Sequence, residues 1–385
     1  MSTGEYLNGN TAIGENALDT AKNTSSRDNS AFGFNALRSL NPGANESTAI
    51  GSQALRGNQT GENTAIGAYA GNQIVGTRNT ATGNWALRYN AGGDDNTGIG
   101  HRALAGTLTE GDPASSGGGD QNTAVGSNAL RGNHDGDDNT AIGVNALMNN
   151  MDASRNCAMG SGALQANVSG RRNCGLGYNV LNNNNGNRNT AVGNRALEMN
   201  INGNNNVATG HKSLMNNTGS WNVASGSHAL LMNTIGEDNV AMGTFALREN
   251  TTGNENTAIG SHSMENTTTG GENTAIGYNS LFNNTTGTKN IAMGSFAQGS
   301  NVSGSGNVGI GYNALHLNVT GFDSVCVGNE TLSNSTLGPN TAVGNYALQY
   351  PTSGTENSAL GLYALNRNTS GSSNCVMGHE SMFFN

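Results

Sequence analysis

The chain has 385 residues and a net charge of −9, and 58 glycines with only 5% aromatic residues leave too few large apolar side chains for a thick globular core. Its acids and bases are scattered along the sequence without a basic stripe to neutralise phosphates, so nucleic acid is not an expected partner. The sequence contains no run of 18 or more apolar residues that could cross a bilayer. Its first residues lack the basic and apolar regions of a signal peptide.

One repeat fills almost the whole sequence. After a short lead-in at residues 1–9, the pattern Asn-Thr-Ala-Ile-Gly-x-x-Ala-Leu and a polar stretch return 22 times between Gly14 and Gly378. Of the 21 intervals between the closing glycines, thirteen are 17 residues and five are 16. A short fixed period is typical of a solenoid. We therefore expect residues 10–385 to form one all-β domain, a parallel β-roll or β-solenoid of about 22 short coils.

Each Asn-Thr-Ala-Ile-Gly segment predicts one short strand, because alternate residues of a strand face opposite sides. We expect its second residue, Thr or Val, to be half-buried and its fourth to be the main core contact. The core positions are Ile13, Ile50, Ile66, Ile142, Ile259 and Ile276. The third residue, Ala or Gly, is small where another backbone approaches. The closing glycines, among them Gly14, Gly51, Gly67, Gly143, Gly260 and Gly277, fit corners with positive φ.

The Ala-Leu dipeptide predicts a second short strand whose leucine meets the isoleucine across the coil. Its representatives are Leu18, Leu130 and Leu247. Asn opens 20 of the 22 motifs, and stacked asparagines can form a ladder of amide hydrogen bonds. Asn63, Asn139, Asn256 and Asn273 are examples of the expected ladder. Each coil would then add one rung of about 4.8 Å to a parallel sheet.

An insertion interrupts the repeat at about residues 105–121, where one interval lengthens to 26 residues. It should leave the coil as an exposed loop, and loops that break a rigid scaffold often carry contacts. Asp112, Pro113 and Ser115 are the candidate contact residues. The alternative interpretation is a tolerated insertion without a role.

The histidines, acidic residues and cysteines show no spacing typical of a catalytic or metal-binding site. The seven histidines lie in separate repeats without a metal-ligand spacing. The spacing of Asp135, Asp137 and Asp138 matches neither the calcium-binding nonapeptide nor the EF-hand loop. These residues fit solvated charges at a corner of the coil. Cys157 and Cys174 fall at equal positions of adjacent repeats, within disulfide reach, although small buried side chains are the simpler interpretation. We expect a protein that is not an enzyme and that has no metal site and no cofactor.

The repeats resemble the head repeats of trimeric autotransporter adhesins of the YadA type and related repeats of phage and viral tail fibres. The residues that carry this resemblance are the Asn/Ser-Thr/Val-Ala-Ile-Gly element and the small residues after it, as at 63–70, 139–147 and 273–281. The resemblance implies a left-handed roll, a homotrimer, and an Ala/Gly column that faces a neighbouring strand or chain. The neck, coiled-coil stalk and membrane barrel of those adhesins are missing from this sequence.

Two functional hypotheses follow. The first is a structural fibre or filament, on a viral appendage or an extracellular surface, that associates with itself and allows a host receptor or glycan as partner. The second is a monomeric solenoid that binds ice or polysaccharide through its Thr column. Interruptions of that column by Val, Ile and Cys favour an inward face and count against the second. No cap is readable at either end, which leaves two explanations: flanking domains are left out of this sequence, or rods stack end to end. We favour stacking into a filament or docking onto a neighbouring fibre segment.

Overall fold

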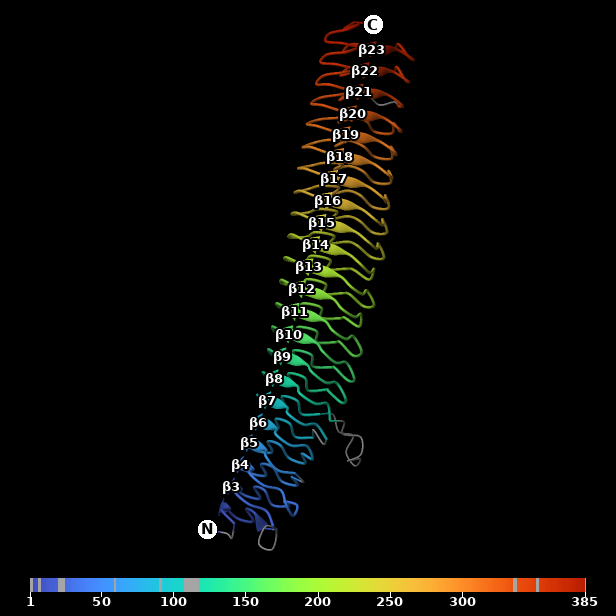
Figure 1. The fold of residues 1–385 in the computed structure, drawn as a ribbon. Helices are drawn as coiled ribbons and strands as arrows, with labels where there is room; N and C mark the ends of the chain where they lie inside the picture. The colour runs from blue at the N-terminus through green and yellow to red at the C-terminus, as the bar shows by residue number, and fades with distance from the viewer. Residues whose placement is uncertain are drawn as a thin grey trace. The chain divides into compact units, whose positions relative to one another are not determined.

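The structure, a computed structural model, describes residues 3–5, 8–19, 25–58, 60–89, 92–106, 118–334, 338–350 and 353–384. Its regular elements are short β-strands joined by turns, and the described residues contain no α-helix and hence none that could cross a membrane. The chain divides into two compact units, unit 1 (Met1–Ala191) and unit 2 (Val192–Asn385). Each unit is a β-solenoid, as the repeat predicts, with one three-residue strand in each coil (Figure 1).

The strands of unit 1 are β1 (Thr3–Glu5), β2 (Thr11–Ile13), β3 (Ser30–Phe32), β4 (Thr48–Ile50), β5 (Thr64–Ile66), β6 (Thr80–Thr82), β7 (Thr97–Ile99), β8 (Thr123–Val125), β9 (Thr140–Ile142), β10 (Cys157–Met159) and β11 (Cys174–Leu176). The two units divide within β12 (Thr190–Val192). Unit 2 contains β13 (Val207–Thr209), β14 (Val223–Ser225), β15 (Val240–Met242), β16 (Thr257–Ile259), β17 (Thr274–Ile276), β18 (Ile291–Met293), β19 (Val308–Ile310), β20 (Val325–Val327), β21 (Thr341–Val343), β22 (Ser358–Leu360) and β23 (Cys375–Met377).

From β2 onward, neighbouring strands within each unit pair in parallel and in register, so equal repeat positions stand next to each other. In β16 and β17, for example, Thr257 pairs with Thr274 and Ala258 with Ala275. The first pairing differs, because β1 runs antiparallel to β2 with Gly4 opposite Ala12. The lead-in therefore covers one edge of the first coil, and the expectation that no cap exists there is wrong.

The strand alternates as predicted, but the prediction has the wrong face inward. The third residue is the buried one: Ala141 and Ala258 are 0% exposed. The fourth residue lies on the outer surface at each predicted core position, with Ile13, Ile50, Ile66, Ile142 and Ile259 exposed and Ile276 partly exposed. The physical reason is the thinness of the coil. A shift of one residue exchanges the two faces of a strand, and only a Cβ fits between the strand and the opposite wall.

Leucines form that opposite wall. Leu18, Leu130 and Leu247 are fully buried, as predicted. They meet the alanines rather than the isoleucines: a Cβ at Gly98, a third position, would lie 3.2 Å from Leu87 Cγ. The Ala-Leu segment is a turn instead of a second strand, and its leucine has φ near +50°, as at Leu130. The leucine amide still bonds to the next coil, Leu130 N–H to Ala146 O at 2.9 Å.

The corner glycines have the positive φ that the sequence predicts. At Gly14, Gly51, Gly67, Gly143, Gly260 and Gly277 φ lies between 132° and 136°. Consecutive glycines stack closely, since a Cβ at Gly126 would stand 2.6 Å from the carbonyl oxygen of Gly143. Both the backbone conformation and the neighbouring coil therefore exclude a side chain.

The asparagine ladder is present, with the backbone N–H as its recurring donor and the predicted side-chain donor at some rungs, such as Asn256 Nδ2 to Asn239 Oδ1 at 3.1 Å. Asn256 N–H donates to Asn239 Oδ1 at 3.0 Å, and Asn273 N–H donates to Asn256 Oδ1 at 3.1 Å. Asn63 and Asn139 accept in the same way, from Asn79 and Asn156. Each side chain thus holds the next coil, because a buried amide needs partners on both sides.

A second asparagine column, which the sequence reasoning missed, runs inside the turn. Asn150 Nδ2 donates to Asn133 Oδ1 at 2.7 Å and to Ala153 O at 2.8 Å. Asn167 continues the column by donating to Asn150 Oδ1. The signal in the sequence is an Asn three residues after the buried leucine, as Asn150 follows Leu147.

Candidate functional site

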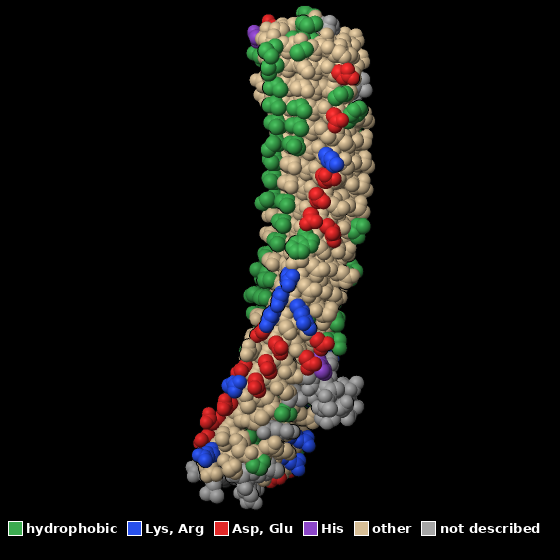
Figure 2. All heavy atoms as spheres, turned by 45° about the vertical axis from the view of Figure 1, so that its right-hand side comes forward, with side chains coloured by type: hydrophobic (Ala, Val, Ile, Leu, Met, Phe, Trp, Pro, Cys, Tyr) green, Lys and Arg blue, Asp and Glu red, His purple; other side chains and the backbone are tan. Residues whose placement is uncertain are grey.

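The outward strand residues form the most extensive candidate surface. In unit 1 the exposed fourth positions carry Ile13, Phe32, Ile50, Ile66, Ile99, Ile142, Met159 and Leu176, while Thr82 and Val125 at the same position are only partly exposed. In unit 2 they include the exposed residues Val192, Met242, Ile259, Met293, Leu360 and Met377. We call these fourth positions the apolar column. Within each unit, in-register pairing places its members one coil apart, and Figure 2 shows hydrophobic side chains in such rows.

Apolar residues at the surface of a soluble protein are ordinary when they stand singly. A contiguous row is different, because large exposed apolar patches mark interaction surfaces. Ile142 and Ile259 are 37% and 36% exposed, so each offers a modest area to a partner. The same modest area recurs from coil to coil.

The second strand positions form a neighbouring outward column. In unit 1, Thr48, Thr64, Thr80, Thr97, Thr123 and Thr140 pair consecutively and are partly exposed. The expectation of a half-buried position is met, whereas the inward face inferred from the interruptions is wrong. Alternation decides this, since the second and fourth residues share the face opposite the buried alanine.

Aromatic rings line the corner after the closing glycine in unit 2. Seven rings succeed one another with centroids 5.2 to 6.4 Å apart: His211, His228, Phe245, His262, Tyr278, Phe296 and Tyr312. In the sequence the histidines lie in separate repeats, and the prediction treats them singly. Stacking of the coils brings three of them into one row. The pKa of His228 is lowered, first by partial burial and then by His211, Lys212 and Arg248.

Glu265 adds a charged group beside this row. Its Oε2 lies 2.5 Å from His262 Nδ1, and its Oε1 lies 3.1 Å from Arg248 Nη1. Although its side chain is only 11% exposed, it is paired twice, which is what a nearly buried carboxylate requires. The carboxylate of Glu265 therefore orients the imidazole of His262.

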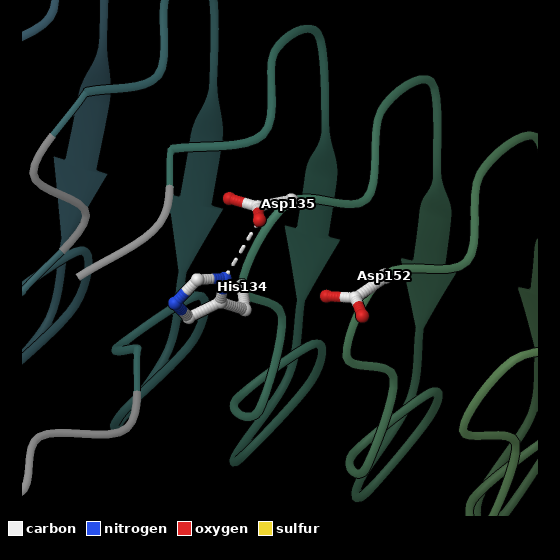
Figure 3. A group of neighbouring side chains, drawn as sticks. All are labelled: His134, Asp135 and Asp152. Carbon is white, nitrogen blue, oxygen red and sulfur yellow. Dashed lines mark ion pairs between the residues drawn. The ribbon is translucent and has the colours of Figure 1, made fainter. Parts of the chain in front are cut away.

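A histidine and two aspartates gather in unit 1 (Figure 3). His134 Nδ1 lies 2.9 Å from Asp135 Oδ2, and with Asp152 of the following coil the three ligand atoms lie within 4.8 Å of one another. One imidazole nitrogen and two carboxylate oxygens suit a divalent cation such as Zn²⁺. Both aspartates are exposed to solvent, however, as the interpretation of solvated corner charges expects.

The cysteines stand as free thiols. Cys157 and Cys174 are direct partners in the β10–β11 pairing, so stacking brings them together as the spacing predicts. Burial and the neighbouring Cys174 raise the pKa of the Cys157 thiol. Cys326 is buried, while Cys174 and Cys375 are exposed, so the interpretation as small buried side chains holds for Cys326 alone. The predicted contact residues Asp112, Pro113 and Ser115 lie outside the described residues.

Comparison with known proteins adds no family. No protein-family model matches the chain, and no curated protein matches it. The functional argument therefore depends on the surfaces described above.

Proposed function

We propose that this protein is a structural fibre that associates with copies of itself, as a homotrimer, through the apolar column. The observation that carries the proposal is the row of exposed Ile, Met and Leu side chains at one position of successive coils. Burying apolar area stabilises association by roughly 25 cal/mol per Å². Each coil buries a further modest apolar area, so the free energy of association increases with the number of coils in the interface. A role in a viral appendage or an extracellular filament, where the fibre would present a surface to a host receptor or glycan, fits this architecture.

The association is tested by the mass in solution. A trimer of the 39.3 kDa chain has a mass of about 118 kDa, which is 3 × 39.3. We expect sedimentation equilibrium to give that mass for the natural chain and a lower one for the double variant Ile142→Asn, Ile259→Asn. The fold should survive in the variant, because both side chains lie on the outer surface.

A matched control uses a fourth position that is already polar. Thr209 of unit 2 occupies the same place in its coil, so Thr209→Asn should leave the mass unchanged. A natural chain that sediments at 39.3 kDa over the whole concentration range would contradict the proposal.

A second candidate function is favoured by one observation, the outward Thr column of unit 1. Six hydroxyl-bearing residues at the parallel strand spacing of about 4.8 Å present a regular row to an ordered lattice such as ice or a polysaccharide. Thermal hysteresis and co-sedimentation with insoluble polysaccharide test it. Activity that disappears in the double variant Thr80→Val, Thr97→Val would support this function over the structural one.

A further inference from the structure

The residue before each motif asparagine forms a column of corner side chains whose charges are sorted by sign. In unit 1, Arg155, Arg172 and Arg188 stand at this position in consecutive repeats, and we call them the basic column. In unit 2, Asp238, Glu255 and Glu272 do the same and form the acidic column. All six side chains are exposed, and Figure 2 shows basic and acidic residues in separate runs. Charges that are scattered in the sequence are thus ordered in the structure, and the expectation that no basic stripe exists is wrong.

The backbone holds these side chains at a repeated geometry. Every member has φ between 57° and 63°, as Arg155 at 63° and Asp238 at 57° show. Each amide also donates to the preceding coil: Arg172 N–H to Ser154 O at 3.2 Å and Glu255 N–H to Glu237 O at 3.0 Å. Within each unit the charges therefore recur with the spacing of the coils, about 4.8 Å.

The residues that flank the two columns have the opposite sign. Asp138 precedes the basic column, and its Oδ2 lies 3.6 Å from Arg155 Nε. Lys289 follows the acidic column, and its Nζ lies 3.9 Å from Glu272 Oε2. Among the described residues no ion pair joins Arg172, Arg188, Asp238 or Glu255 to a partner in the same chain. These four side chains therefore present uncompensated charge.

We propose that the basic column of one copy pairs with the acidic column of a second copy that runs antiparallel. Read forward, Asp138, Arg155, Arg172 and Arg188 carry one negative and then three positive charges. Read backward, Lys289, Glu272, Glu255 and Asp238 carry one positive and then three negative charges. Four consecutive positions are complementary in this order. In a parallel arrangement the three arginines still meet the three acidic residues of the other copy. Asp138 and Lys289, however, no longer lie opposite each other.

Each copy carries both columns, so the contact needs only a second copy of this chain. It unites copies through corner residues and charge, whereas the apolar column of the proposed trimer uses the outer strand face. Stacked like charges repel within one copy, and complementary charge from a partner removes that repulsion. The occupant is therefore a second copy of this chain, which carries a column of the required sign, length and spacing.

Salt dependence gives the first test. In sedimentation velocity we expect the full chain to form a larger species at about 10 mM salt, where the Debye length is about 30 Å, and to lose it at about 1 M, where that length is about 3 Å. Association through the apolar column would persist in high salt, so the two proposals fail separately. A mass that does not change with salt overturns the antiparallel pairing.

Charge exchange tests the register. Arg188→Glu should weaken the salt-dependent association on the order of tenfold or more, since the proposed ion pair with Asp238 of the other copy becomes repulsive. Asp238→Arg in the same chain should restore it, because position 188 meets position 238 in the antiparallel order. Glu272→Arg should fail to restore it, and a rescue by Glu272→Arg alone would establish the parallel order and overturn the proposal. Arg131→Glu, with the same change in net charge outside the columns, is the matched control.

Two further measurements locate the contact. A zero-length carbodiimide should join Lys289 of one copy to Asp138 of another, identified by mass spectrometry on mixed ¹⁴N and ¹⁵N chains. Trp221, 57% exposed, stands at the same corner one coil before Asp238. In a Trp85→Phe background its fluorescence should shift to the blue at low salt. Absence of both the mixed-isotope cross-link and the shift, in a chain that associates at low salt, would place the contact elsewhere.

Discussion

Units 1 and 2 are built from the same coil and differ in what the coil displays. The inward residues are equivalent: Ala141 and Ala258 are both fully buried, as are Leu147 and Met264 in their turns. The outward second position is mostly Thr in unit 1 and mostly Val or Ile in unit 2, as Thr123 and Val240 show. The difference teaches that the inward positions specify the coil, whereas the outward positions are free to specify contacts.

Substitution of a corner glycine should have the largest effect and the same effect in both units. Gly126 has φ of 132° and Gly210 of 126°, and at each a Cβ would stand 2.6 Å from the carbonyl oxygen of the next corner glycine. Gly126→Ala and Gly210→Ala should each cost about 3 kcal/mol or more, because backbone strain adds to the steric clash. Chemical denaturation measures the loss. A loss in one unit alone would show that the corners are not equivalent.

Overpacking the inward alanine should have the next largest effect. Ala141→Leu in unit 1 and Ala258→Leu in unit 2 force extra methylene groups against the leucine wall, which typically costs about 1–3 kcal/mol. Thermal melting should show a similar decrease for both variants. An unchanged melting temperature for Ala258→Leu would mean that its column does not face the interior.

Exchange of outward residues between the units should change stability little. Thr123→Val gives unit 1 the side chain of unit 2, and Val240→Thr does the reverse. Both positions are partly exposed, so we expect changes within about 0.5 kcal/mol in the free energy of unfolding. A cost comparable to that of the alanine variants would refute the distinction between scaffold and display positions.

The smallest expected effect is a pH dependence confined to the aromatic row of unit 2. Because the folded pKa of His228 is lowered, the unfolded chain binds the proton more tightly. This contribution to stability is present above the ordinary histidine pKa of about 6.5 and is lost as the pH falls below that value and through the lowered pKa of the folded state. His228→Asn introduces the residue that Asn128 supplies at the same repeat position of unit 1. The variant should lose less stability than the natural chain between about pH 7 and pH 5.5, as measured by melting temperature.

The sequence predicted the period, the parallel solenoid, the corner glycines and the asparagine ladder, since each depends on a position that stacking repeats. It placed the wrong face inward because Ile is more hydrophobic than Ala. That rule fails in a coil too thin for both Ile142 and Leu147. The volume of the side chains decides which face of the strand lies inside. The repeat period is the same for either face, so the period alone does not identify the inward residues.

The surfaces were harder to predict for a related reason. Arg155, Arg172 and Arg188 lie 16 or 17 residues apart and look scattered until their coils are superimposed. The same holds for His211 and His228, whose rings stand 5.2 Å apart. Writing the sequence with one coil per line would reveal both rows, but not the side-chain contacts of Glu265.

The hydrogen bonds of the asparagine ladder join neighbouring coils, as from Asn139 to Asn122 and from Asn156 to Asn139. A coil thus interacts mainly with the coils before and after it, and their interiors are interchangeable. Within a unit, unequal crossover between repeats in the gene would remove or add whole coils while preserving every junction. Length then becomes an inherited quantity that changes in discrete steps, independently of the surface that each coil displays.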